Sequence, residues 1–145
     1  MKLWCAVVTV ALGLVTAACS DSETAAKAIG DPPRVELIGS AVAALEAALG
    51  GPQRYFEVNA TPTLVNLFVA NEDATQATAY VYLGEELQEP DPSQPAQGPT
   101  FAASEMTFDA ATVLSEVRAK LPQATLRAFS AVGSDSGGVA YVVTV

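Results

Sequence analysis

The sequence predicts an α+β domain in which two helices pack on one face of an antiparallel sheet of about six strands, in the order α-β-β-β-β-α-β-β. Two stretches, 33–49 and 109–121, carry apolar residues at helical spacing, and the segments between and after them are rich in β-branched and aromatic residues. The connections are short, which favours antiparallel pairing. The order of helix, strand, turn and strand occurs at 35–70 and again at 110–145, which suggests an internal duplication.

The first helix is expected over 33–49. Asp31-Pro32-Pro33 offers an N-cap residue followed by prolines, which the first turn of a helix tolerates. Gly50-Gly51-Pro52 ends the helix. Between these signals the apolar residues follow 3-4-3-4 spacing and form one stripe: Val35, Ile38, Val42, Leu45 and Leu49.

Three strands are expected next, at 54–60, 63–70 and 77–83, separated by turns at Thr61-Pro62 and Asn71-Glu72-Asp73. The acidic, proline-rich stretch 84–99 is expected to be an exposed, poorly ordered loop. A fourth strand, 100–107, precedes a helix capped by Asp109 and stopped by Pro122, with Val113, Val117 and Leu121 on one side. Strands 125–131 and 138–145 follow, joined by a turn at 133–138.

The first 19 residues have the layout of a secretory leader. Met1-Lys2 is a short positive segment, Leu3 to Val15 is apolar, and Thr16-Ala17-Ala18 supplies small residues before Cys19. The stretch Val15-Thr16-Ala17-Ala18-Cys19 resembles the lipobox of bacterial prolipoproteins, although Thr16 stands where that family more often has leucine. The resemblance implies that 1–18 is a signal peptide and that Cys19 is acylated with diacylglycerol.

Two other interpretations of the leader stay open: an ordinary cleaved signal with a coincidental cysteine, and an uncleaved membrane anchor at the lower limit of spanning length. Cys5 is not expected to be the acylation site, because bulky Trp4 precedes it. Residues 19–33 are small and polar and are expected to form a lipidated, flexible tether. The remaining residues, 34–145, are long enough for a single domain with one core.

The composition argues against several functions. The chain has 16 acidic and 7 basic residues; loss of Lys2 with the leader leaves six, a net charge of −10. Such a field repels nucleic acid and anionic head groups, so membrane attachment must be hydrophobic. The chain has no histidine, and its two cysteines are Cys5 and Cys19. We therefore expect no disulfide, metal site or cofactor in the folded part, and no enzymatic activity.

The remaining chemical candidates are carboxylates and lysines. Acid-base work without histidine would need paired carboxylates, and Glu57, Glu105 and Glu116 are the candidates in ordered segments, but no spacing pairs them. Lys27 and Lys120 are interpreted as solvated. The acidic cluster of 84–99 lacks the alternating order of a calcium loop, so a solubilising loop is favoured over a weak cation site; it comprises Glu85, Glu86, Glu89 and Asp91.

Strands 63–70 and 77–83 are apolar on both faces, which two helices on one side cannot cover. If Val65, Leu67 and Val69 face the helices, the opposite face carries an apolar and tyrosine-rich surface: Tyr55, Leu64, Phe68, Tyr80 and Tyr82. These five residues would form an apolar patch of roughly several hundred Å², and a patch of that size usually marks a contact surface. Two alternatives are that the sheet curls or the 84–99 loop covers these residues, and that the faces are assigned the wrong way round.

The order of elements is similar to the duplicated helix-on-sheet units of PepSY-type and cystatin-like domains, without any signature residue. Together these features predict a lipid-anchored envelope lipoprotein on the extracytoplasmic face of the cell membrane. It would act as a non-catalytic interaction module, binding an envelope protein or itself. The alternative is a carrier of lipid or another small hydrophobic ligand, because the chain resembles mycobacterial envelope carrier lipoproteins in leader, length and element order.

Overall fold

The computed structural model describes residues 30–145. The predicted signal peptide at 1–18, Cys19 and the tether up to residue 29 lie outside the described residues. Pro33 is fully buried, and the amide of Arg34 donates a hydrogen bond to the carbonyl oxygen of Thr61 at 2.9 Å. The folded domain therefore already includes Pro33, the last residue assigned to the tether.

The first helix begins with a 3-10 turn, Val35–Leu37, and continues as α1, Ile38–Leu49. The predicted stripe is confirmed along most of its length, since the buried residues of α1 are Ile38, Ala41, Val42 and Leu45. Leu49 lies in the last turn and is exposed. Spacing of three and four residues thus selected the side of the helix that packs on the sheet.

The two ends of this first helix are set differently from one another. At the C-terminal end, Gly50 takes a φ of +82°, the left-handed conformation that glycine adopts without a Cβ clash. At the N-terminal end, the expected cap at Asp31 is wrong: neither the 3-10 turn nor α1 has a side-chain cap. The reason is that the chain at Arg34 is bonded to Thr61 and lies against the sheet before it turns into the helix.

Strands β1 (Arg54–Ala60), β2 (Leu64–Ala70) and β3 (Gln76–Leu83) form an antiparallel meander. Their bounds agree with the expected strands to within one residue. The β1–β2 turn is closed by the hydroxyl of Thr61, which accepts the amide of Leu64 at 3.2 Å. Alternating apolar residues between turn-forming residues were therefore a sufficient signal for this part of the sheet.

The acidic, proline-rich segment 84–99 lies along the outer edge of β3. It contains β4 (Glu86–Leu87) and β5 (Gln94–Pro95), which both pair antiparallel with β3. Between them, the amide of Asp91 donates to the carbonyl oxygen of Ala79 at 3.1 Å. The segment is exposed as expected, but the expected poor order is wrong. Prolines are compatible with this position, because an edge strand has one unpaired side.

The expected strand 100–107 is largely wrong. Only β6 (Phe101–Ala102) pairs with β1, and a 3-10 turn, Ala103–Glu105, follows at once. The carboxylate of Glu105 turns back and accepts the amide of Ala102 at 2.6 Å, which ends the strand. Phe101 is buried beside Tyr55, with ring centroids 5.9 Å apart.

The second helix, α2 (Ala110–Lys120), has the expected N-cap: the carboxylate of Asp109 accepts the amide of Thr112 at 3.1 Å. That hydrogen bond holds the pKa of Asp109 below its usual range. Strands β7 (Ala128–Gly133) and β8 (Val139–Thr144) form the expected C-terminal hairpin. β7 begins three residues later than expected.

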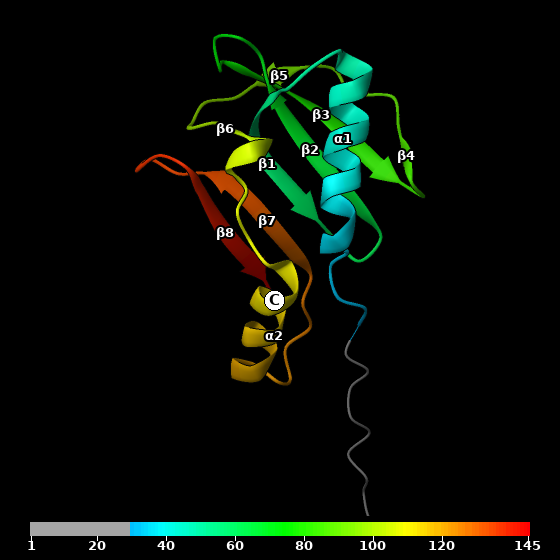
Figure 1. Ribbon diagram of the computed structural model, residues 1–145, viewed down its shortest axis with the longest axis vertical. Helices are drawn as coiled ribbons and strands as arrows, with labels where there is room; N and C mark the ends of the chain where they lie inside the picture. The colour runs from blue at the N-terminus through cyan, green and yellow to red at the C-terminus, as the bar shows by residue number, and fades with distance from the viewer. Residues whose placement is uncertain (1–29) are drawn as a thin grey trace, which may run out of the picture.

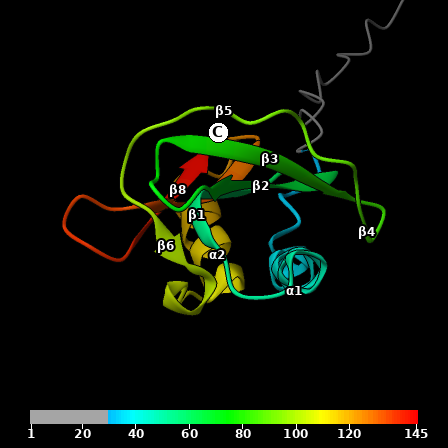
Figure 2. The same ribbon diagram turned by 90° about the horizontal axis from the view of Figure 1, so that it is seen from above.

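The eight strands form one antiparallel sheet in which six follow the order β4-β3-β2-β1-β7-β8, while β5 pairs with β3 and β6 with β1. The α+β class is confirmed, with two strands more than expected. Both helices lie on the same side of the sheet, which we call the inner face, and the 84–99 segment arches past β3 on the other side, the outer face (Figures 1 and 2). The core fills the space between the helices and the inner face.

Candidate functional site

The predicted tyrosine-rich surface does not exist as predicted. Tyr55 is 0% exposed and Tyr82 5% exposed, and Tyr80 is half-buried and packs against the core. Tyr80 pairs with Leu67 and Tyr82 with Val65, which are both buried on the inner face. The assignment of Tyr55, Tyr80 and Tyr82 to the outer face is therefore wrong.

Tyr55 and the other two tyrosines were misplaced for different reasons. The register of β1 shifts between Tyr55 and Glu57, so one extra residue, Phe56, interrupts the alternation. As a result Tyr55 and Val58 both lie in the core. β3 is apolar on both faces, so hydrophobic alternation did not distinguish Tyr80 and Tyr82 from their neighbours.

The other two predicted residues, Leu64 and Phe68, do lie on the outer face. Leu64 pairs with Leu83 and Phe68 with Ala79 on one face, whereas Val65 and Leu67, which alternate with them in β2, are buried on the inner face. Both Leu64 and Phe68 are half-buried, and Phe68 lies beside the 84–99 segment. The same register brings further apolar residues beside them, and we call this set the outer surface: Leu64, Phe68, Ala79, Val81, Leu83, Val132, Ala140 and Val142.

A row of polar side chains crosses the middle of the outer surface. The Asn66 amide Nδ2 donates to Asn59 Oδ1 at 3.2 Å, and Asn59 Nδ2 donates to Ser130 Oγ at 2.7 Å. The row continues to Val81 at one end and Val142 at the other. The three polar residues come from β2, β1 and β7, so no local pattern in the sequence revealed the row. The one signal in the sequence was the presence of Asn59 and Asn66 within predicted strands, where asparagine is uncommon.

The 84–99 segment covers only the β3 end of the outer face. There it walls a hollow of about 310 Å³, whose floor is apolar and whose rim includes a carboxylate; the lining residues are Phe68, Ala77, Ala79, Asp91, Pro92, Gln94 and Pro95. The side chains of Thr78 and Ser93 are hydrogen-bonded at 2.7 Å and help to fix the segment. The rest of the outer surface, from β2 to β8, has no helix over it (Figure 2).

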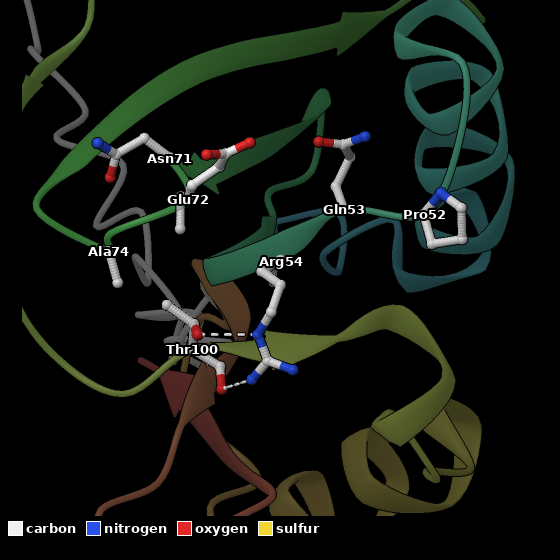
Figure 3. A pocket seen from close by; sticks show the side chains of 8 residues that line it. Pro52, Gln53, Arg54, Asn71, Glu72, Ala74 and Thr100 are labelled. Carbon is white, nitrogen blue, oxygen red and sulfur yellow. Dashed lines mark hydrogen bonds between the residues drawn. The ribbon is translucent and has the colours of Figure 1, made fainter.

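A second hollow, of about 330 Å³, lies where β1 begins, and Arg54 points from its wall toward Thr100 (Figure 3). The Arg54 guanidinium donates from Nε to Thr100 Oγ1 at 3.0 Å, and from Nη2 to the Thr100 carbonyl oxygen. Its Nη1 also lies 3.6 Å from Glu105 Oε2. These contacts tie β1 to the segment that enters β6, so the arginine serves the fold at this position.

The carboxylates considered for acid-base work are placed on separate elements. Glu57 lies on β1 beside Phe68, Glu116 lies exposed on α2, and Glu105 is held by the Ala102 amide and Arg54. Within residues 30–145, no group of three or more histidine, cysteine or acidic side chains is arranged to hold a metal ion. Ser134 and Gly137 form the tight turn between β7 and β8.

One tyrosine–carboxylate contact lies at the margin of the core and is partly buried. The hydroxyl of Tyr55 donates to Glu46 Oε1 at 3.1 Å, and the same oxygen accepts the amide of Gln53 at 3.1 Å. Burial, followed by the negative charge of Glu46 and this hydrogen bond, raises the pKa of Tyr55 well above its usual range. The hydroxyl therefore stays protonated at neutral pH, and the pair joins α1 to the start of β1.

No protein-family model, curated protein or solved structure matches this chain. Within the described part of the chain, the helices are too short or too polar to cross a bilayer.

Proposed function

We propose that this protein is a lipid-anchored, non-catalytic interaction module whose outer surface binds another protein of the cell envelope. The observation that carries the proposal is the position of the two helices: α1 packs over the inner face and α2 contacts the core on the same side through Val113 and Leu114, whereas the outer face keeps apolar side chains on several strands. Contiguous apolar surface with a few polar groups is typical of a contact site.

The polar row suits such a contact. In the hydrogen-bonded row Asn66–Asn59–Ser130, the side-chain oxygen Oδ1 of Asn66 and the hydroxyl hydrogen of Ser130 are not used by bonds within the row. A partner that covers the apolar residues on both sides of the row would be able to bond the half-buried Asn66 end, whereas Ser130 is 7% exposed and serves to fix the other end of the row. The row would then select the register of the partner, while the apolar residues supply most of the buried area.

The proposal makes a first prediction, about contact. We expect a photo-activatable amino acid at Val81, on the outer face, to form a covalent adduct with an envelope protein in the native host. The same amino acid at Leu49, exposed at the end of α1, should form none. Phe68→Ala should lower the yield at Val81 about tenfold, the loss typical of a residue worth about 1.4 kcal/mol in an interface.

The outcomes of this crosslinking experiment separate the competing functions. Adducts with lipid at Val81, in place of protein, would favour the carrier alternative. Equal protein adducts at Val81 and Leu49, or none at Val81, would overturn the outer surface as a binding site.

The proposal makes a second prediction, about anchoring, which rests on the lipobox-like stretch ending at Cys19. Two acyl chains hold a protein on a bilayer stably, because each buried methylene contributes about 0.8 kcal/mol. We expect the native protein to stay in the membrane fraction through a high-salt wash, and intact-mass analysis to show a chain that starts at a diacylated Cys19.

The matched variants for anchoring are Cys19→Ser and Cys5→Ser. We expect Cys19→Ser to abolish acylation and processing, and Cys5→Ser to change neither, since residue 5 would be removed with the leader. A native product of unmodified mass, or one that keeps its first 18 residues, would contradict the anchor without affecting the contact experiment.

A further inference from the structure

The two edges of the sheet differ in how they are protected. The β3 edge is occupied by the 84–99 segment, which bonds to it from Leu83 to Thr75. β8 forms the opposite edge and pairs only with β7 among the described residues. An unpaired edge strand presents free amide and carbonyl groups and is a template for pairing with another strand.

The turn before β8 determines which of its residues direct their backbone amide and carbonyl groups away from β7. The amide of Ser134 donates to the carbonyl oxygen of Gly138 at 3.1 Å, and the β7–β8 register continues unbroken from Gly133↔Val139 to Ala128↔Thr144. In an antiparallel pair, alternate residues direct both backbone groups to the same neighbour. The even-numbered residues of β8 therefore bond to β7, and Val139, Tyr141 and Val143 present their amides and carbonyls at the free edge.

β8 lacks the features that usually prevent edge pairing. The stretch VAYVVTV, residues 139–145, contains no charged side chain, proline or glycine, and the β7–β8 register contains no bulge. Val142 is 48% exposed and Val145 51% exposed. The chain thus protects one edge with the 84–99 segment and leaves a regular apolar strand at the other.

We propose that β8 pairs antiparallel with β8 of a second copy of this chain. The net charge of −9 opposes the approach of two copies, but 139–145 has no charged side chain, so no like charges meet in the contact itself. An antiparallel pair of identical strands is self-complementary about a twofold axis, which makes a second β8 a matching occupant of this edge. Because the 84–99 segment blocks the β3 edge, β8 of one copy has no free β3 edge to join. The two β8 strands are then related by a twofold axis, and the assembly closes as a dimer.

This dimer is independent of the partner proposed for the outer surface. Pairing at β8 would join the outer faces of two copies into one sheet, since Ala140 and Val142 lie on that face at the edge. It would leave the central polar row free. A dimer on a membrane would also carry two lipid anchors if the proposed anchoring holds.

The test uses the processed full chain in detergent micelles and two matched variants, Val142→Lys and Leu83→Lys. Both replace a half-exposed outer-face residue, 48% and 46% exposed, but Val142 lies on the free edge strand β8 and Leu83 lies on β3, near the opposite edge. By sedimentation velocity we expect the parent protein and Leu83→Lys to be dimers. Val142→Lys brings two like charges to the twofold contact and should weaken the dimer about 100-fold.

Hydrogen exchange identifies the surface used. The amides of Val139, Tyr141 and Val143 should exchange slowly in the parent dimer and quickly in Val142→Lys, while the β7 amides stay protected in both. The proposal is overturned if the parent protein is a monomer at every concentration measured, if Val142→Lys remains a dimer, or if Leu83→Lys dissociates as well. The last result would place the contact on the outer surface.

Discussion

Replacing Gly133 with alanine is expected to destabilise the protein by about 3 kcal/mol, the upper part of the range for overpacking. A Cβ at this position would lie 2.1 Å from the carbonyl oxygen of Pro99 and 2.5 Å from its carbon. Both atoms are backbone, so no side-chain rotamer relieves the clash. The end of β7 or the segment entering β6 would have to move.

Neither side of this contact is free to move. Gly133 is paired with Val139 in the β7–β8 hairpin, and the residue after Pro99 is Thr100, which Arg54 holds through two hydrogen bonds. Glycine is required here for the close approach of two backbones. The clash therefore strains the place where the 84–99 segment meets the end of β7. We expect the backbone amides there to be the first to lose protection against hydrogen exchange.

Gly39→Ala is the matched control for Gly133→Ala. Gly39 is exposed within α1, and a Cβ added to it would meet no other atom within 4 Å. Alanine is favoured over glycine by about 0.5–1 kcal/mol in a helix interior and by less in the first turn, where Gly39 lies, so this variant should be at least as stable as the parent. Urea unfolding followed by circular dichroism measures both. A Gly133→Ala protein as stable as the parent would contradict the close approach.

Most elements of the fold were predictable because glycine, proline and capping residues mark their ends. Gly50 ends α1, Asp109 caps α2, and Ser134 and Gly137 close the last hairpin. The errors occur where a contact between residues distant in sequence determines whether a segment forms a strand. Segment 84–99 forms two short strands along the edge of β3, and β6 gives way after two residues to a turn in which Glu105 accepts the Ala102 amide.

The faces of the strands were harder to predict than the strands themselves. Leu64 and Phe68 were placed correctly because β2 alternates with the buried Val65, Leu67 and Val69. The three tyrosines were placed wrongly, because the irregularity at Phe56 leaves no mark in the sequence and β3 is apolar throughout. The polar row needed the register of three strands, which a sequence alone does not supply.

The internal duplication stays a prediction, with which the topology is compatible. The units α1-β1-β2 and α2-β7-β8 meet where β1 pairs antiparallel with β7, and the strand order β2-β1-β7-β8 is symmetric about that pair. A duplicated unit would produce such an arrangement with a twofold axis between β1 and β7.

Phe129→Ala is expected to cost about 3–5 kcal/mol of stability, the range for removing a fully buried phenylalanine. Phe129 is 0% exposed on the inner face of β7. Its ring lies 5.0 Å from that of Phe108 and 5.9 Å from that of Tyr141, measured between centroids. Phe108 directly precedes Asp109, the cap of α2, so this aromatic cluster attaches the helix to β7 and β8.

Phe68→Ala is the control for Phe129→Ala, because it removes the same side chain from the outer face. Phe68 is half-buried with no helix above it, so we expect a cost of about 1 kcal/mol, as for an average substitution. Thermal and urea unfolding would measure both losses. Equal losses would mean that the outer face is packed as tightly as the inner one, and a surface packed in this way would not be available to a partner. A large difference would leave Phe68 free to act in binding, separate from folding.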